Sequence, residues 1–129
     1  MITELLPNPA SPQTDAADEF IEIYNPNSKA FDLKGYGLEV GTTTLRKFTF
    51  TDSIVVPAMS YMAFYSADTH LSLSNSGGQA RFQGLDGALV SESSTYETAD
   101  GNAAWALADG VWKWSMTPTS GLFNTITAA

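Results

Sequence analysis

Carboxylates are the side chains of this sequence best suited to chemistry, and they gather near its start. Residues 1–32 hold six acids against one base, Lys29. Two close carboxylates could serve as the acid and the nucleophile or base of a glycosidase. That reaction needs a deep cleft, and a small domain with short loops offers little room for one, so we expect no catalytic residue and no enzyme. The six acids are Glu4, Asp15, Asp18, Glu19, Glu22 and Asp32.

The acidic stretch PQTDAADE, residues 12–19, is the candidate metal site. Calcium prefers several oxygen ligands, and Asp15, Asp18 and Glu19 would supply them from one loop. The spacing matches no EF-hand loop, and solvated loop acids are the simpler interpretation. Calcium is therefore the one cofactor that we consider, with these three residues as its candidate ligands.

Nucleophilic chemistry finds little support in the sequence. There is no cysteine, which removes thiol catalysis and cysteine-based zinc sites. The single histidine, His70, has Ser66 and Asp68 nearby in sequence, as a Ser-His-Asp site would require. No serine lies in the GxSxG turn of a nucleophile elbow, so we interpret His70 as a loop residue.

Glu22 is a special case among the acids because it lies within a strand-like pattern. Phe20, Glu22 and Tyr24 share one face of EFIEIY. A carboxylate on an aromatic face needs hydrogen-bond or charge partners when it is buried. We predict that Glu22 and Tyr24 are structural, and that Glu22 is not a general base.

Two of the three tryptophans stand two residues apart in VWKWSM. Trp112 and Trp114 share one parity of a strand, facing polar residues on the other. Pro118 ends this strand, and Gly121 completes the following turn. We predict that the pair fills a hydrophobic core, each indole covering a large area. The alternative is an exposed platform for a ligand.

Short alternating segments with frequent turns predict an all-β fold. The dipeptides Asp86-Gly87 and Asp109-Gly110 predict two hairpins. A turn of helix is expected only in residues 69–74. The first expected strand begins at residue 2. The others lie in residues 19–24, 36–40, 46–50, 60–65, 79–83, 88–96, 104–107 and 111–116.

Size and charge restrict the domain organisation and the partners. The 129 residues are enough for one domain, with residues 2–124 ordered and 125–129 a tail or linker. A net charge of -8 argues against nucleic acid and against an anionic membrane surface. No apolar run approaches the roughly 20 residues of a membrane span. The first residues lack the pattern of a signal peptide.

Four segments resemble, in order, the lamin-tail domain in its prokaryotic form. They are ITELLPNP (2–9), DEFIEIYNP (18–26), FDLKGYGL (31–38) and DGVWKWSMTPTSGLFN (109–124). Residues 73–96 are similar to the middle hairpin of that family. Two departures are a longer turn at residues 117–121, where the family has Thr-Pro-Gly, and Tyr36, where it often has Trp.

The resemblance implies an immunoglobulin-like β-sandwich of about 8–9 strands, found in secreted and surface proteins. It implies a non-catalytic module that mediates protein interaction or attachment outside the cell, in which Glu22 holds neighbouring backbone. The DNA contacts of animal lamin tails are not expected here, because nothing basic matches them. The alternative is a polymer- or carbohydrate-targeting module appended to an extracellular hydrolase or nuclease. Exposed rings would favour that alternative, with Tyr36, Tyr61, Tyr65 and Trp105 as candidates.

Overall fold

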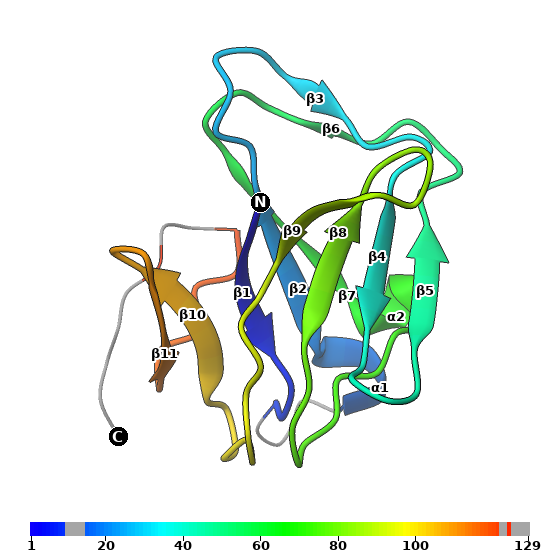
Figure 1. Cartoon of the computed structure of the whole chain (residues 1–129). Coiled ribbons are helices and arrows are strands. Elements are labelled where there is room, and N and C mark those ends of the chain that lie inside the picture. The colour runs from blue at the N-terminus through cyan, green and yellow to red at the C-terminus, as the bar shows by residue number, and fades with distance from the viewer. Residues whose placement is uncertain (10–14, 122–123, 125–129) are drawn as a thin grey trace.

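Two antiparallel sheets pack face to face in the computed structural model, which describes residues 1–9, 15–121 and 124 (Figure 1). The five-stranded sheet has the order β11-β10-β1-β2-β7, and the four-stranded sheet has the order β5-β4-β8-β9. The strands of the first are β1 (Ile2–Leu6), β2 (Phe20–Tyr24), β7 (Tyr61–Tyr65), β10 (Ala104–Ala108) and β11 (Val111–Ser115). Those of the second are β4 (Gly37–Val40), β5 (Arg46–Thr49), β8 (Ala80–Gln83) and β9 (Leu89–Glu92).

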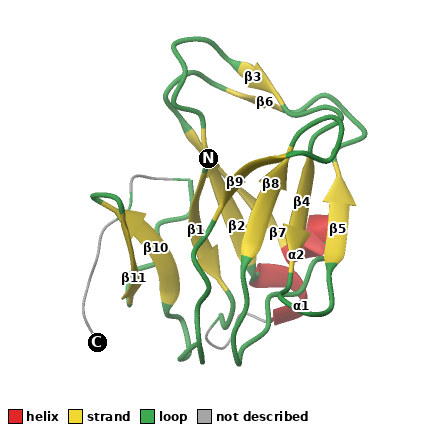
Figure 2. Cartoon of the chain, in the orientation of Figure 1, coloured by secondary structure: helices red, strands yellow, loops and turns green. Residues whose placement is uncertain are grey.

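Short elements close the two ends of the sandwich (Figure 2). The two-residue strands β3 (Phe31–Asp32) and β6 (Val55–Val56) pair at the end where the chain begins. The helices α1 (Asp15–Asp18) and α2 (Ser66–Thr69) lie at the other end. The prediction of a helical turn in residues 69–74 was wrong, because α2 begins at Ser66 and ends at Thr69. Helices of four residues are too short for any periodic pattern to reveal them.

The all-β prediction is confirmed, and the described residues form eleven strands, including the two-residue pair. Both predicted hairpins are also confirmed. Asp109 and Gly110 join β10 to β11 with φ angles of 52° and 76°. Two successive positive φ angles define the turn that matches strand twist, and Asp-Gly is among its preferred sequences. Between β8 and β9, Gly87 has φ 82° in a loop closed by the Gly84 N–H bond to the Ala88 carbonyl.

The main hydrophobic core lies between the sheets. Leu5 and Ile21 from the five-stranded sheet meet Leu38 and Phe82 from the four-stranded sheet, and all are nearly or fully buried. The sheets bury these faces because alternate residues of each strand point inward. A smaller cluster of Leu6, Phe20 and Ala104 lies on the outer face of the five-stranded sheet.

Two β-bulges interrupt the strand pairing. In β1, Ile2 pairs with Ile23 and Glu4 with Glu22, which leaves Thr3 without a partner on β2. In β9, Ser91 pairs with Phe82 and Leu89 with Gln83, which leaves Val90 unpartnered on β8. An extra residue of this kind bends its strand and redirects side chains.

One row of residues crosses the outer face of the five-stranded sheet. Residues 117–121 and 124, which follow β11, are called the closing segment. This segment contacts the row through hydrogen bonds. Alanines flank the two central glutamates, and their small side chains allow the closing segment to approach the sheet. In strand order the row is Lys113, Ala106, Glu4, Glu22 and Ala63.

Candidate functional site

Two carboxylates do lie side by side, as a catalytic pair would require, but they have no access to solvent. Glu4 and Glu22 face each other across β1 and β2, and each has 0% exposure. Their partners belong to the protein itself. A substrate would therefore have to displace the closing segment before it reached either carboxylate.

Each carboxylate of this pair accepts a backbone N–H of the closing segment. Glu4 Oε2 accepts from Thr119 N at 2.9 Å, and Glu22 Oε2 accepts from Gly121 N at 2.8 Å. The bulged Thr3 donates its hydroxyl to Glu22 Oε1 at 2.8 Å. Burial raises the pKa of Glu4, although its hydrogen bonds with Thr119 oppose this. The pair connects the segment after β11 to the first two strands.

The candidate calcium ligands do not form a site in the part of the chain that the structure describes. Glu19 has 3% exposure and accepts Leu73 N at 2.8 Å, so it attaches the loop after α2 to the start of β2. Asp18 is half-buried, and Asp15 is described only by its backbone in α1. Within the described residues, no group of three or more metal-binding side chains occurs.

The remaining candidates for chemistry are on the surface. His70 is exposed at the end of α2, with φ 59°. Asp32 is exposed, and its carboxylate accepts the Ser53 hydroxyl at 2.6 Å and the Lys34 amide at 3.0 Å. The hydrogen bond from Ser53, followed by that from Lys34, lowers the pKa of Asp32. His70 thus ends α2, and Asp32 caps the turn that follows β3.

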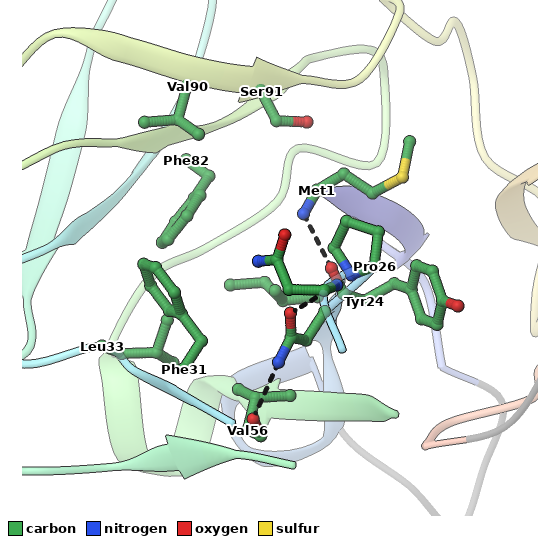
Figure 3. A pocket seen from close by; sticks show the side chains of 12 residues that line it. Met1, Tyr24, Pro26, Phe31, Leu33, Val56, Phe82, Val90 and Ser91 are labelled. Carbon is green, nitrogen blue, oxygen red and sulfur yellow. Dashed lines mark hydrogen bonds between the residues drawn. The ribbon is translucent and has the colours of Figure 1, made fainter. Parts of the chain in front are cut away.

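An open apolar cavity of about 220 Å³ lies at the end of the sandwich beside β3 and β6 (Figure 3). Its inner wall is part of the core, with Phe31, Leu33 and Phe82 on one side. Pro26 and Met1 form the opposite wall, and β9 passes above it. The remaining residues that line it are Ile23, Tyr24, Asn25, Asn27, Val56, Val90 and Ser91.

Two polar side chains keep this cavity in shape. Asn25, with 4% exposure, donates to the carbonyls of Lys29 and Val56 at 2.9 and 3.1 Å. Ser91 Oγ accepts the Ile2 N–H at 3.0 Å, which attaches β9 to β1. Val90, the bulged residue of β9 next to Ser91, is 55% exposed at the rim of the cavity. The hydrogen bonds of Asn25 and Ser91 thus tie together the segments around the cavity, and Val90 adds an exposed apolar side chain to its rim.

Comparison with known families now assigns the chain. Residues 1–124 match the model of the Lamin Tail Domain. The chain belongs to the lamin tail domain family. The matched range contains both sheets and the closing segment of this lamin tail domain, and the immunoglobulin-like sandwich that the resemblance implied is confirmed. No curated protein matches the chain significantly.

The tryptophans and the tyrosines considered for a ligand platform lie in separate places on this lamin tail domain. Trp112 and Trp114 are half-buried on the β10–β11 hairpin, where both pack against the core, with Trp114 at 4.9 Å from Trp105. Tyr36 stacks on Phe82 at 5.4 Å and is also part of the core packing. On the outer face of β7, the rings are Tyr61, which contacts Tyr24 at 4.4 Å, and Tyr65, which is hydrogen-bonded to Ser120. The four rings proposed for a carbohydrate platform therefore form no single cluster.

The sequence of this lamin tail domain did not predict the cavity, nor that Glu22 lies opposite Glu4 and accepts the Gly121 N–H. The only available signals were the apolar pair Leu89-Val90 after a hairpin and the Asn-Pro turn at residues 25–26. Neither shows which distant segments meet there.

The described helices are all too short to cross a membrane.

Proposed function

We propose that this lamin tail domain is a non-catalytic module of a secreted or cell-surface prokaryotic protein, and that it mediates protein interaction or attachment. Its docking site is the cavity beside β9, and the occupant is an apolar side chain on an extended segment of a partner protein. The observation that carries this proposal is an open cavity with core side chains as its wall and Val90 exposed at its rim. Exposed apolar surface of this kind is typical of interaction sites.

The chemistry of the cavity supports a side chain as occupant. Its volume of about 220 Å³ is below the roughly 300–1,000 Å³ of pockets for drug-sized ligands. Its wall is almost entirely apolar, and Asn25 already uses its amide within the protein. A side chain that fills a desolvated pocket is typical of the centre of a protein interface. The exposed Leu85 and Leu89, 70% and 55% exposed, extend the apolar surface along the same hairpin.

Peptide display tests the docking site without a known partner. A library of random peptides is selected on the immobilised domain, and the affinities of the selected peptides are measured by calorimetry. We expect peptides with a large aliphatic or aromatic residue, and we expect Val90→Asp to weaken their binding by about tenfold or more. The matched control is Val111→Asp, which changes a valine of 51% exposure on another edge strand and should leave binding unchanged.

Two results would overturn the docking site. One is that Val111→Asp and Val90→Asp weaken binding equally. The other is that the amide resonances perturbed by the peptides lie away from β9 and the cavity.

The location of the protein is tested separately. An antibody against this domain is applied to culture supernatant, intact cells and cell lysate from the source organism. Signal in the supernatant or on intact cells is expected. Signal found in the lysate alone would contradict the secreted or surface location, whatever the peptides bind.

A further inference from the structure

The hydroxyl of Thr119 has two acceptors and one proton. It lies 2.9 Å from Glu4 Oε1 and 3.2 Å from Asn124 Oδ1, in a region where all three residues are nearly or fully buried. A hydroxyl can donate only one hydrogen bond but can also accept. If Glu4 were ionised, either its Oε1 or the amide oxygen of Asn124 would lack a proton from Thr119.

The orientation of Asn124 is fixed by its other contacts. Its Nδ2 donates to the carbonyl oxygens of Thr3 and Leu107 at 2.7 and 2.8 Å. The opposite orientation would place an amide oxygen against two carbonyl oxygens. Asn124 Oδ1 is therefore the atom that faces Thr119, and it can only accept.

We infer that Glu4 is a neutral carboxylic acid in the folded protein at neutral pH, while Glu22 opposite it is ionised. In this arrangement, Glu4 Oε1–H donates to Thr119 Oγ1, and the Thr119 hydroxyl donates to Asn124 Oδ1. Glu4 Oε2 remains the acceptor for Thr119 N. Each hydrogen bond in the series from Glu4 through Thr119 to Asn124 then has one donor and one acceptor.

The surroundings of the pair favour this assignment. Glu22 accepts hydrogen bonds from the Thr3 hydroxyl and the Gly121 N–H, which stabilise a charged carboxylate. Glu4 directly opposite would be a second buried charge of the same sign, and such pairs hold one proton between them. Burial also raises the pKa of Glu4.

Among the residues that the structure describes, no base lies within this network to neutralise a second charge. The closing segment contributes no titratable side chain among its described residues, and β10 contributes only alanines to this face. Lys113 is exposed two strands from Glu4. The other titratable side chains that the described strands place on this face are Tyr24 on β2 and Tyr61 and Tyr65 on β7.

Because Glu4 carries a proton and Glu22 does not, the attachment of the closing segment depends on pH in both directions. Loss of the Glu4 proton leaves Asn124 Oδ1 without its donor and creates two adjacent charges. Protonation of Glu22 removes the charge that strengthens its hydrogen bonds with the Thr3 hydroxyl and the Gly121 N–H. The closing segment is thus held most firmly while one carboxyl is neutral and the other is charged.

Carbon-13 NMR of the glutamate side chains tests the proton assignment directly. The domain is labelled at the glutamate carboxyl carbon and observed at pH 7, and resonances are assigned with Glu4→Gln and Glu22→Gln. We expect one carboxyl carbon at the chemical shift of a neutral acid, and we expect it to be missing in Glu4→Gln. The inference is overturned if every glutamate has the shift of an ionised carboxylate, or if the neutral resonance is missing in Glu22→Gln instead.

Amide hydrogen exchange in wild type and Glu4→Gln gives a second test that does not need Glu22→Gln to fold. The glutamine amide reproduces a neutral acid, since its NH₂ can donate to Thr119 Oγ1 and its oxygen can accept Thr119 N. We expect protection of the Thr119 amide to change by less than about threefold in Glu4→Gln. A loss of about tenfold or more, the size expected for a broken hydrogen bond, would contradict a neutral Glu4.

Discussion

The two bulged residues, Thr3 in β1 and Val90 in β9, show how one backbone device leads to opposite outcomes. Thr3 is 6% exposed and places its hydroxyl on Glu22, within a buried network. Val90 is 55% exposed and places an apolar side chain at the rim of a cavity. The two bulges are neighbours in space, because the Ile2 N–H bonds to Ser91 Oγ.

The difference lies in what covers each strand. β1 is the middle strand of its sheet and is covered on both faces, so a redirected polar group must find a partner. β9 is an edge strand, so a redirected apolar group can remain in solvent. Burial of polar groups thus marks the part of this domain that maintains the fold. Exposure of apolar groups marks the part available to a partner.

The largest effect on stability is expected at the buried side of this comparison. Glu22→Gln replaces the buried charged acceptor of the Thr3 hydroxyl and the Gly121 N–H by a neutral amide, which weakens both hydrogen bonds. We expect it to lower the free energy of unfolding by about 2–4 kcal/mol. Urea unfolding measures the change. The matched control is Glu92→Gln, in which a side chain of 47% exposure lies 4.0 Å from Arg81. It should change stability by less than about 1 kcal/mol, and equal effects would remove the distinction between the two regions.

The β10–β11 hairpin tests how apolar packing compares with the polar network. Trp114 is half-buried, between Trp105 and Tyr96, with ring distances of 4.9 and 5.8 Å. We expect Trp114→Ala to lower the free energy of unfolding by about 2–3 kcal/mol, below the loss for a fully buried ring. An unchanged urea midpoint would show that the indole contributes no packing and would favour the ligand platform.

The pH dependence of stability sharpens the role of Glu4. Burial raises its pKa above the ordinary value of 4.5, so the folded protein holds this proton more tightly than the unfolded chain. The contribution of Glu4 is complete below this ordinary value and is lost as pH rises through the folded pKa. Urea unfolding of wild type and Glu4→Gln across this range should show wild type losing stability relative to the variant. A constant difference would contradict the raised pKa.

The smallest effect on stability is expected at the exposed bulge. Val90→Asp should change the free energy of unfolding by less than about 0.5 kcal/mol, because its side chain is already largely in solvent. Thermal unfolding of this variant beside Val111→Asp measures the effect. A large loss for Val90→Asp alone would mean that Val90 supports the fold and that the cavity is a packing defect.

Local signals in the sequence predicted the strands and turns of this domain well. Asp109-Gly110 predicted its hairpin because few residues tolerate two positive φ angles in succession. The alternation of Phe20, Glu22 and Tyr24 predicted that they share a face. The two four-residue helices were missed or misplaced, and the two-residue strands were not expected, because such short elements depend on distant partners.

The sequence by itself determined the all-β class, the positions of the hairpins and the placement of a carboxylate on an apolar strand face. These follow from backbone preferences and from side-chain alternation within a few residues. Only the tertiary structure decided that Glu4 lies opposite Glu22 and that residues 117–121 and 124 cover them. The tertiary structure likewise decided that an open cavity lies beside the bulge in β9. These features join residues up to 121 positions apart, as in the bond from Asn124 to Thr3, and no local pattern records which distant segments meet.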